Sequence, residues 1–585
     1  MNMLAELLTS SIGPALVLLI GAVVELIIGR WLRRPGWLTG LALFFVGAAA
    51  LLLLGLRAQP VVPVYSRPWQ PLLQNGANLM WVGDGWNWYI SGLIVLLGGL
   101  GILLEMNTRR TGPPPDADSI PGLSAPISTP SPTLRIHASL SVHLGILGAS
   151  LLFVGSGNLL TAILTWVVLD LLVLVRSAVR VEPTGPHRSA AHAQEGRAKG
   201  LSLIGALLLL IGLLLAGPSG PGQPLQGGVL PAETILLMLV AAVIRAGIYP
   251  FHLWLMPTDP QRVDLAERLL DHMVPVLGGL WLLGWTTDLG AEFILMQPWV
   301  VLLLVLSLLG SAIAAWTARE QPFHSTFVLT TSAGLAALAS VLAFSPGPET
   351  LIWPTTAFAL GGALWLVGER VWEEWHWQIP VSVGALALAG VPFTPGFLTQ
   401  PALARLLISA PIYLLLFLIY ALAQGLQIAA MLRSWGAAQR DDQPTLLSGA
   451  TMRLLAASLA LGLPLAVAGF LPRAVAALAS LPNAIPPLLG SPPIVVAEMP
   501  VWIALSVPLA LGIALVWLRT PIWAALGNLP ARVGVFMRLE WLFDLSWWGV
   551  NQTSNIWGNA LRVVEGAGYM GWAAVFALLA YLLIR

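Results

Sequence analysis

Apolar runs dominate the chain and recur along its whole length, separated by short polar segments rich in proline and glycine. About sixteen of these runs approach the length of about 20 residues that a helix needs to cross a bilayer. The pattern predicts an all-α polytopic membrane protein with about sixteen transmembrane helices and no folded soluble domain. The runs occupy residues 8–29, 37–56, 88–105, 138–155, 158–176, 200–217, 232–256, 270–288, 296–317, 324–345, 352–368, 379–399, 403–424, 450–472, 500–519 and 567–584.

The composition agrees with this pattern and excludes several functions. Hydrophobic residues make up 57% of the chain and charged residues only 9%, and the net charge of +1 offers no basic surface for a nucleic acid. Cysteine is absent from the 585 residues, so thiolate ligands for iron-sulfur clusters or zinc are absent as well. We therefore predict no metal site, no cofactor and no catalytic redox centre in this chain.

Basic residues indicate the orientation of the helices. Segments after odd-numbered runs carry most of the arginines, and the positive-inside rule then places the N-terminus outside. The segments on the inner side include Arg109, Arg176, Arg188, Arg268 and Arg433, whereas those on the opposite side hold only Arg57, Arg67 and Arg405.

One stretch, Arg245 to Leu255, places a permanent charge and a proline inside an apolar run. A charged side chain at the bilayer centre costs about 2.5–3.5 kcal/mol on insertion scales, so such a residue indicates a functional site. Pro250 lacks the amide hydrogen that a helix requires at that position. The stretch predicts a helix that is broken at membrane depth and buried in protein.

The same stretch, Arg-Ala-Gly-Ile-Tyr-Pro-Phe-His-Leu-Trp-Leu, resembles a motif of the antiporter-like membrane subunits of respiratory complex I, the Mrp antiporters and the membrane hydrogenases. In that family a lysine precedes Pro-Phe-His-x-Trp-Leu-Pro, and Arg245 occupies its position. Residues 388–400, Leu-Ala-Gly-Val-Pro-Phe-Thr-Pro-Gly-Phe-Leu-Thr-Gln, are similar to the family's second broken helix. Its terminal lysine is Gln400 here. The resemblance covers roughly residues 80–440.

This resemblance implies a 14-helix antiporter-like core with two broken helices in inverted repeats. The expected breaks lie at Pro250 and at Pro392 to Pro395. The implied division of the chain has four parts: helices 1 to 3 in residues 1–110, a first repeat in 135–290, a second repeat in 296–472, and an extension in 500–585 with an interfacial helix and a terminal transmembrane helix.

The resemblance also implies a proton relay of one glutamate, several lysines and histidines, and this sequence departs from it. The only lysine is Lys199, in a predicted loop, and arginine neither releases its proton nor accepts one. The lysine expected in the eighth helix falls near Met273 or Val274, and the histidine of the tenth helix aligns with Ser332. The remaining candidates for a proton path or charge coupling are Asp170, Arg245, His252, His272 and Gln400.

Each candidate also has a structural interpretation. Asp170 and Arg245 would form either a fixed ion pair, worth roughly 4 kcal/mol at about 4 Å and an effective dielectric constant of 20, or a charge-coupling pair. His252 would bond a carbonyl freed by Pro250 or relay protons, and His272 and His143 would be core or relay histidines. A further polar cluster at a membrane boundary is interpreted as a solvated face. It contains Glu369, Glu373, Glu374 and His376.

The resulting hypothesis is an antiporter-like membrane-arm subunit of a complex I-type NADH:quinone oxidoreductase, with a modified or silent proton path, in a bacterial inner membrane. Flavin, iron-sulfur clusters and quinone would belong to partner subunits of the membrane arm and the peripheral arm, and lipid would surround the chain. One alternative is a subunit of an Mrp-type cation/proton antiporter, a membrane hydrogenase or an inorganic-carbon uptake complex. The other is a purely structural arm subunit.

Overall fold

The structure is a computed structural model of the whole chain. It describes residues 2–31, 34–59, 61–69, 78–105, 132–180, 188–217, 220–256, 264–290, 297–318, 320–436, 449–486 and 498–566.

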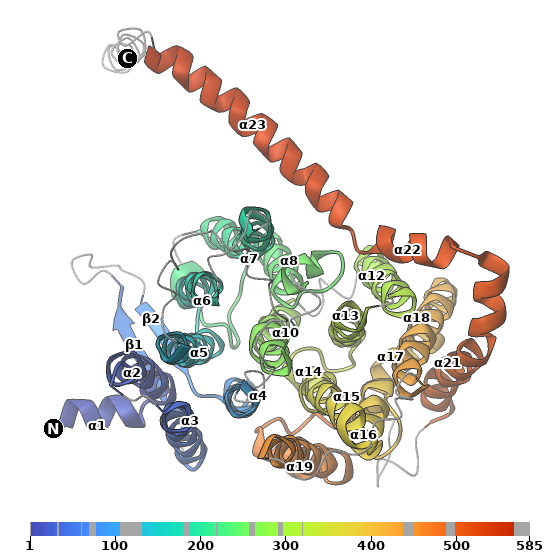
Figure 1. Cartoon of the computed structure of the whole chain (residues 1–585), viewed down its shortest axis with the longest axis horizontal. Helices are drawn as coiled ribbons and strands as arrows, with labels where there is room; N and C mark the ends of the chain where they lie inside the picture. Colours follow the sequence, from blue (N-terminus) through green and yellow to red (C-terminus); the bar gives the residue numbers. More distant parts are fainter. Residues whose placement is uncertain are drawn as a thin grey trace, which may run out of the picture.

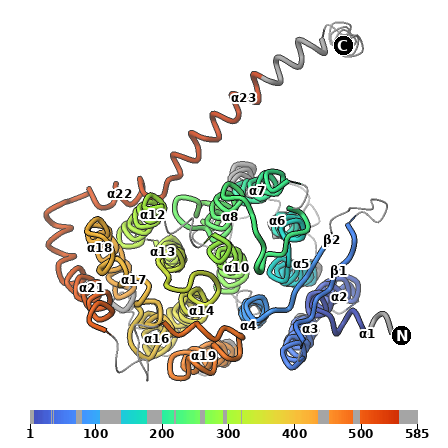
Figure 2. The backbone as a smooth tube through the Cα atoms, turned by 180° about the vertical axis from the view of Figure 1, so that it is seen from behind, coloured from blue at the N-terminus to red at the C-terminus, as the bar shows by residue number. Residues whose placement is uncertain are grey.

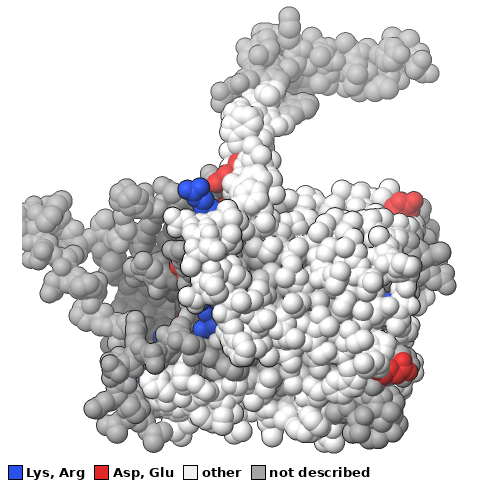
Figure 3. Space-filling view, turned by 90° about the vertical axis from the view of Figure 1, so that its right-hand side faces the viewer, with Lys and Arg blue, Asp and Glu red and all other residues white. Residues whose placement is uncertain are grey.

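The protein is a bundle of helices that are seen nearly end-on in Figure 1. The N-terminal helices form one end of the bundle, and α12 (Pro298–Thr317), α18 (Pro411–Gly436) and α21 (Met499–Leu526) lie at the other. Between them stand α4 (Gly85–Glu105), α10 (Val274–Leu289) and α14 (Pro348–Thr356), and Figure 2 shows the same arrangement from behind. An antiparallel hairpin of two strands stands beside α2, α5 and α6. Figure 3 shows the side that carries α18 and α21, where a broad surface is almost free of charge and the charged residues lie toward its left and right sides, as a surface in contact with lipid requires.

Within the described residues, ten helices are long and apolar enough to cross a membrane, and three shorter apolar helices accompany them. The other predicted spans correspond to α8, to α10 and to residues 567–584, which lie outside the described residues. The all-α polytopic fold predicted from the sequence is therefore confirmed. The elements of the first half are α1 (Asn2–Thr9), α2 (Gly13–Ile28), α3 (Pro35–Arg57), β1 (Val64–Pro68), β2 (Asn78–Val82), α4 (Gly85–Glu105), α5 (Pro132–Val154), α6 (Leu159–Arg180), α7 (Arg188–Leu215), η2 (Gly220–Gly222), α8 (Ala232–Arg245), η3 (Phe251–Leu255), α9 (Leu265–Glu267), η4 (Arg268–Met273) and α10 (Val274–Leu289).

The second half continues with the same alternation of long helices and short interruptions. Two of the interruptions in the chain, η4 and η5, are π-helical, whereas η2, η3 and η6 are 3₁₀ helices. The elements are α12 (Pro298–Thr317), α13 (Gln321–Val341), α14 (Pro348–Thr356), η5 (Ala357–Gly362), α15 (Ala363–Trp375), α16 (Ile379–Ala389), η6 (Pro395–Thr399), α17 (Gln400–Ile408), α18 (Pro411–Gly436), α19 (Gly449–Phe470), α20 (Pro472–Leu478), α21 (Met499–Leu526), α22 (Leu529–Met537) and α23 (Glu540–Gly566).

Both predicted broken helices are interrupted, but each ends before its proline. α8 ends at Arg245 and α16 at Ala389, and each is followed by a glycine with positive φ, Gly247 at 60° and Gly390 at 74°. The hydrogen bonds are the same at both ends: the glycine N–H bonds to the carbonyl three residues back, and the next N–H bonds to the carbonyl five residues back. This is the Schellman cap, which only glycine enters without strain. The cap, rather than the proline, ends each helix.

Other helix boundaries differ from the prediction. The run 403–424 is not one helix: its first residues belong to α17, which follows the second break, and the rest begins α18 after Ala410. The basic segment 181–199 was predicted as a loop, yet α7 already begins at Arg188 and includes Lys199. The prediction assigned Arg176, Arg268 and Arg433 to segments between the spans. In the structure all three also lie within helical segments.

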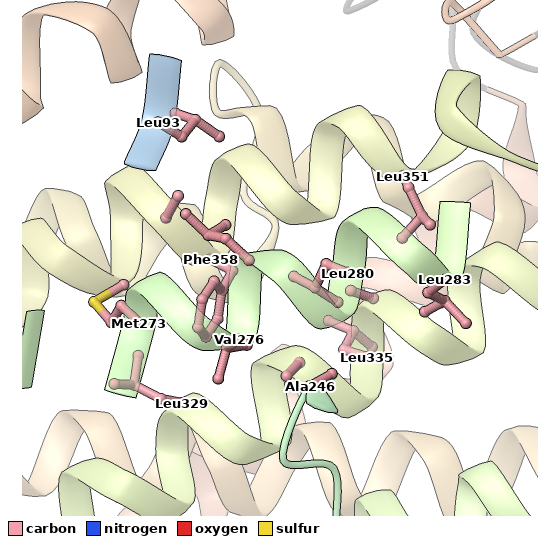
Figure 4. Packing of buried hydrophobic residues seen from close by; sticks show 14 of the residues in the cluster. Leu93, Ala246, Met273, Val276, Leu280, Leu283, Leu329, Leu335, Leu351 and Phe358 are labelled. Carbon is pink, nitrogen blue, oxygen red and sulfur yellow. The ribbon is translucent and has the colours of Figure 1, made fainter. Parts of the chain in front are cut away.

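The interior of the bundle is centred on α10. Met273, Val276, Leu280 and Leu283 point in several directions from this helix and its π-helical start, and they meet Phe358 and other side chains from neighbouring helices (Figure 4). All four are at most 2% exposed. An apolar helix that is buried on every side belongs in the middle of a large bundle. The first and second halves are therefore joined by a continuous apolar core.

The connecting segments separate onto two sides of the bundle. A depression of about 440 Å³ is lined by residues that follow the second, sixth, eighth, tenth and fourteenth predicted runs, among them Asp84, Gln226, Asp288, Glu349 and Ser480. These even-numbered segments lie together, as alternate membrane crossings require. Which side is outside stays a prediction.

The C-terminal extension leaves the bundle. α22 packs along α12, and α23 then runs away from the body as a long isolated helix (Figure 1). Its apolar side chains Trp541, Leu545, Trp548 and Ile556 are exposed. The interfacial position of this segment stays a prediction. The predicted final span, 567–584, lies outside the described residues.

Candidate functional site

The first helix break positions a buried ion pair. Arg245 is the last residue of α8, and its Nη1 lies 2.5 Å from Oδ1 of Asp170 in α6. Arg245 is 1% exposed and Asp170 is 6% exposed. The contact that the sequence suggested is present. It joins two residues that are 75 positions apart in the chain and belong to different helices.

Hydrogen bonds and aromatic rings complete the surroundings of the pair. Ser202 of α7 accepts a hydrogen bond from Arg245 Nη1 at 2.7 Å and donates one to Asp170 Oδ1 at 3.2 Å. Trp166 donates its indole N–H to Asp170 Oδ2 at 2.9 Å, and its ring lies under the guanidinium at 5.0 Å. The sequence did not point to Ser202 or Trp166, because a serine near the start of the predicted run 200–217 and a tryptophan in an apolar run carry no specific signal.

Arg245 keeps unused donors in this tight site. Among the described residues, Nε and Nη2 have no hydrogen-bond partner. The adjoining cavity measures about 10 Å³ and is lined by Asp170, Ser202, Arg245 and Trp254, which leaves room for about one water molecule. A pair with one fixed cation and almost no water can hold charge at this position, but its guanidinium cannot pass a proton on.

Side chains next to the break donate hydrogen bonds to its backbone carbonyls. Trp254 donates its indole N–H to the carbonyl of Ile244 at 2.9 Å, and Ser307 of α12 donates its hydroxyl to the carbonyl of Tyr249. His252 is fully buried and stacks on Tyr249, with ring centroids 5.0 Å apart, and also contacts Phe327. The aromatic residues of the motif therefore cover the end of α8.

His272 lies on the other side of the same break. It belongs to the π-helical segment η4, and it lines a cavity of about 10 Å³ together with Ala246, Thr326 and Thr330. The neighbouring residues of η4 point elsewhere: Asp271 forms an ion pair with Arg176 of α6, and Arg268 donates a hydrogen bond to Ser325 of α13 at 2.6 Å. π-Helical turns inside α-helices frequently occur at functional sites.

The second break has no charged pair among the described residues. Gln400 begins α17 and is 2% exposed, and its Nε2 packs so closely on Gly390 that a Cβ there would collide with it. Gln424 donates to the carbonyl of Leu388 at 3.4 Å, and Gln427 donates to the Ser332 hydroxyl at 2.7 Å. Ser332, where the resemblance places a histidine, is thus bonded to an amide. Gln400 thus belongs to the second break, and the structure does not bring it into the group around Asp170 and Arg245.

The polar cluster at the end of α15 differs from its interpretation as a solvated face. Glu373 and Glu374 flank the exposed Arg370 and form ion pairs with it, but Glu369 is only 6% exposed. Glu369 lies within electrostatic reach of Arg268 and beside Gln321 of α13. The prediction was wrong for Glu369 because α15 turns this one position inward, toward α13 and η4.

Comparisons with known proteins agree with the predicted fold. No protein-family profile matches the chain. A chain of the Mrp complex from Dietzia sp. DQ12-45-1b superposes with a TM-score of 0.68 at 16% identity, covering 98% of this chain and 63% of that one. A chain of respiratory complex I from Thermus thermophilus superposes with a TM-score of 0.62 at 19% identity, covering 81% of this chain and 98% of that one. The chain has the antiporter-like fold.

The curated relative points in the same direction. A protein of Rhizobium meliloti (strain 1021), described as a probable K(+)/H(+) antiporter subunit, is 25% identical over 385 residues, which cover 57% of this chain. This chain spans 33% of the length of that relative. The antiporter-like fold and the integral membrane character that the sequence predicts are confirmed, and the ion and the complex belong to the proposal below.

Proposed function

We propose that this chain is an antiporter-like membrane subunit that takes part in proton or cation translocation within a multisubunit membrane complex. The observation that carries the proposal is the pair of glycine-capped helix breaks, with the buried Asp170–Arg245 pair at the end of the first. Charges at broken helices near the membrane centre are the usual ion-coupling sites of transporters.

The parent complex is proposed to be of the Mrp type or of the complex I type. The Mrp type is favoured by the match along 98% of this chain and by the relative named for K(+)/H(+) antiport. The complex I type is favoured by the match that spans 98% of the Thermus thermophilus chain. In the second case, flavin, iron-sulfur clusters and quinone would be bound by partner subunits; for the clusters the reason is that this chain has no cysteine to ligate them.

The proton path is proposed to be modified. Asp170–Arg245 holds charge where the resemblance places a lysine, and Gln400 is neutral where it places another. His252 and His272 stay candidates for a water-assisted path past the first break. We expect this chain to lack a complete lysine-based relay.

The test is to purify the intact complex, identify its co-purifying subunits and reconstitute it in vesicles that contain a pH-sensitive dye. Proton movement driven by a K⁺ or Na⁺ gradient would support the Mrp type, and acidification driven by NADH would support the complex I type. Native complex is compared with Asp170→Asn, Arg245→Lys and His272→Ala, and with Glu373→Gln as an exposed control. Assembled variants that lose one subunit's share of pumped protons would contradict the silent path. A native complex that moves no ion would contradict the proposed function.

Orientation in a bacterial cytoplasmic membrane, with the N-terminus outside, is testable by labelling because the chain has no native cysteine. Gln226→Cys and His376→Cys introduce single thiols at exposed positions in even- and odd-numbered segments. We expect an impermeant maleimide to label only Gln226→Cys in intact cells. The reverse pattern would invert the topology.

A further inference from the structure

A second buried polar group lies where α4, α5 and α6 meet, and the proposed function does not use it. Nδ1 of His143 in α5 lies 2.9 Å from Oε2 of Glu105, the last residue of α4. Ser139, one turn before His143, donates its hydroxyl to Oε1 of Glu105 at 2.9 Å. His143 is fully buried. A histidine facing a carboxylate inside a membrane bundle is a site where a proton can be held.

Two further charges extend this group toward the centre of the bundle. Arg176 lies six residues after Asp170 on α6 and is 2% exposed. It forms an ion pair with Asp271 in the π-helical segment η4 and is also within electrostatic reach of Glu105. Arg176 therefore stands between two carboxylates, one on α4 and one on η4. It also shares α6 with the Asp170–Arg245 pair.

These four groups differ in what they can do with a proton. Arg176, like Arg245, cannot release one. His143 can, because imidazole binds and releases a proton near neutral pH. With Nδ1 facing Glu105, the Nδ1 proton is donated to the carboxylate, and the exchangeable proton is the one on Nε2. Binding that proton makes the ring a cation beside an anionic partner.

We propose that His143 and Glu105 form a proton-binding site of the first half, held in place by Arg176 and Asp271, which exchanges the proton that Arg245 cannot. The proposal rests on the function proposed above. It assigns proton exchange to the end of α4, and it leaves the Asp170–Arg245 pair as a fixed charge that the bound proton influences along α6.

The pH response of this site depends on every charged group that faces it. The helices packed against α5 are α2, α3, α4, α6 and α10. α2 contributes a fully buried carboxyl, and α5 itself contributes a second histidine. The arginine of α3 lies at the far end of that helix and bonds to the end of α20 and to Ser480. These groups are Glu25, Glu105, His137, Asp170, Arg176, Asp271 and Arg57.

The experiment uses the intact complex in vesicles and measures proton translocation between pH 5.5 and 9. We expect His143→Gln to lower the rate at least about 100-fold, the lower end of the range for a lost acid-base group. Glu105→Gln should move the midpoint of the pH profile toward acid, because the protonated ring loses its anionic partner. Arg176→Lys should retain the native profile, and Arg176→Gln should not. His324→Gln is the matched control, a buried histidine of α13 that lies outside this group.

A second measurement does not depend on transport. Infrared difference spectra of the complex, recorded during a pH titration with ¹³C-labelled histidine, should contain an imidazole band that is absent from His143→Gln and displaced toward acid in Glu105→Gln. If His143→Gln does not assemble, Glu105→Gln alone supplies the displaced band. A purely structural histidine would give no titrating band.

The outcomes separate the two proposals. A native complex that translocates ions, with an assembled His143→Gln variant of unchanged rate, pH profile and imidazole bands, overturns the proton-binding site but leaves the function standing. A native complex that translocates nothing, yet loses the titrating band in His143→Gln, overturns the function and retains proton binding at this site.

Discussion

The two broken helices share one backbone design and differ in chemistry. Both end in Ala-Gly, with the glycine in the left-handed conformation and the same pair of cap hydrogen bonds. The first presents Arg245 to Asp170, whereas the second is contacted by the neutral amides of Gln400 and Gln424. The comparison teaches that the backbone interruption does not require charge. A helix break can accommodate a charged side chain, and the neighbouring residues determine whether a charge is present there.

The largest effect is expected where the charge of the first break is unbalanced. Arg245→Leu leaves Asp170 as a buried, unpaired carboxylate and should destabilise the protein by about 3–5 kcal/mol. Adding Asp170→Asn should recover most of the loss, because asparagine keeps an acceptor for the Trp166 N–H. The yield of assembled complex and its thermal midpoint measure both. Gln427→Leu, at a neutral site, should cost only about 1 kcal/mol. Equal losses in the single and double variants would mean that the pair is not coupled.

Placing a charge at the second break sharpens the same comparison. Gln400→Lys puts an ammonium beside Gly390, among neutral amides, and should cost about 2.5–3.5 kcal/mol. Gln400→Met keeps the volume without charge and should cost less than about 1.5 kcal/mol. Thermal unfolding of the assembled complex gives both values. A lysine variant with native stability would show that the second break already holds an acceptor for a cation.

The shared backbone design is tested at its glycines. Gly247→Ala and Gly390→Ala each place a side chain at positive φ, and a Cβ there would collide with Leu255 and with Gln400, respectively. Each variant should lose about 1–3 kcal/mol. Pro392→Ala should lose less than about 1 kcal/mol, since α16 has already ended. Thermal midpoints of the three assembled variants give the ranking. If Pro392→Ala were the more damaging, the proline rather than the glycine would determine the break.

A pH-dependent effect is expected far from both breaks, at Asp84, which precedes α4 and accepts a hydrogen bond from the Asn87 N–H at 2.8 Å. Burial raises the pKa of Asp84 from its ordinary 3.8 to about 7. The folded protein thus holds this proton more tightly than the unfolded chain, so its stabilising contribution is complete below about pH 4 and is lost as the pH rises through about 7. Asp84→Asn, which keeps the acceptor, should flatten the decline of the thermal midpoint between about pH 4 and 7. An unchanged slope would exclude Asp84 as its source.

The predictable part of the molecule is the part that local pattern controls. Apolar length located most spans, and the Arg245–Leu255 and 388–400 motifs located both breaks. The caps could also have been located, because glycine just after an apolar helical run is a termination signal. The run 403–424 was mispredicted because it is apolar on both sides of Ala410, although Pro411, the first residue of α18, is a helix-start signal.

The candidate site was predictable only at its strongest charges. Asp170 and Arg245 are conspicuous because any ionised side chain in an apolar run needs a partner. Ser202 and Trp166 could not be predicted, since their residue types are common in membrane helices. Glu105 and Arg176 lie near helix ends, where a charged residue is ordinarily in water, and so their burial was not expected.

The amino-acid sequence by itself determined that the chain is a polytopic helical membrane protein with two interrupted helices, because the apolar spacing and the backbone limits of glycine and proline act locally. Only the tertiary structure decided which charges are buried and paired. Pairing depends on helices that are distant in sequence coming within side-chain reach, as α6 does with α8 through Asp170–Arg245 and with η4 through Arg176–Asp271. The same packing gives Arg245 a fixed partner and brings His143 to Glu105, and it surrounds the second break with neutral amides.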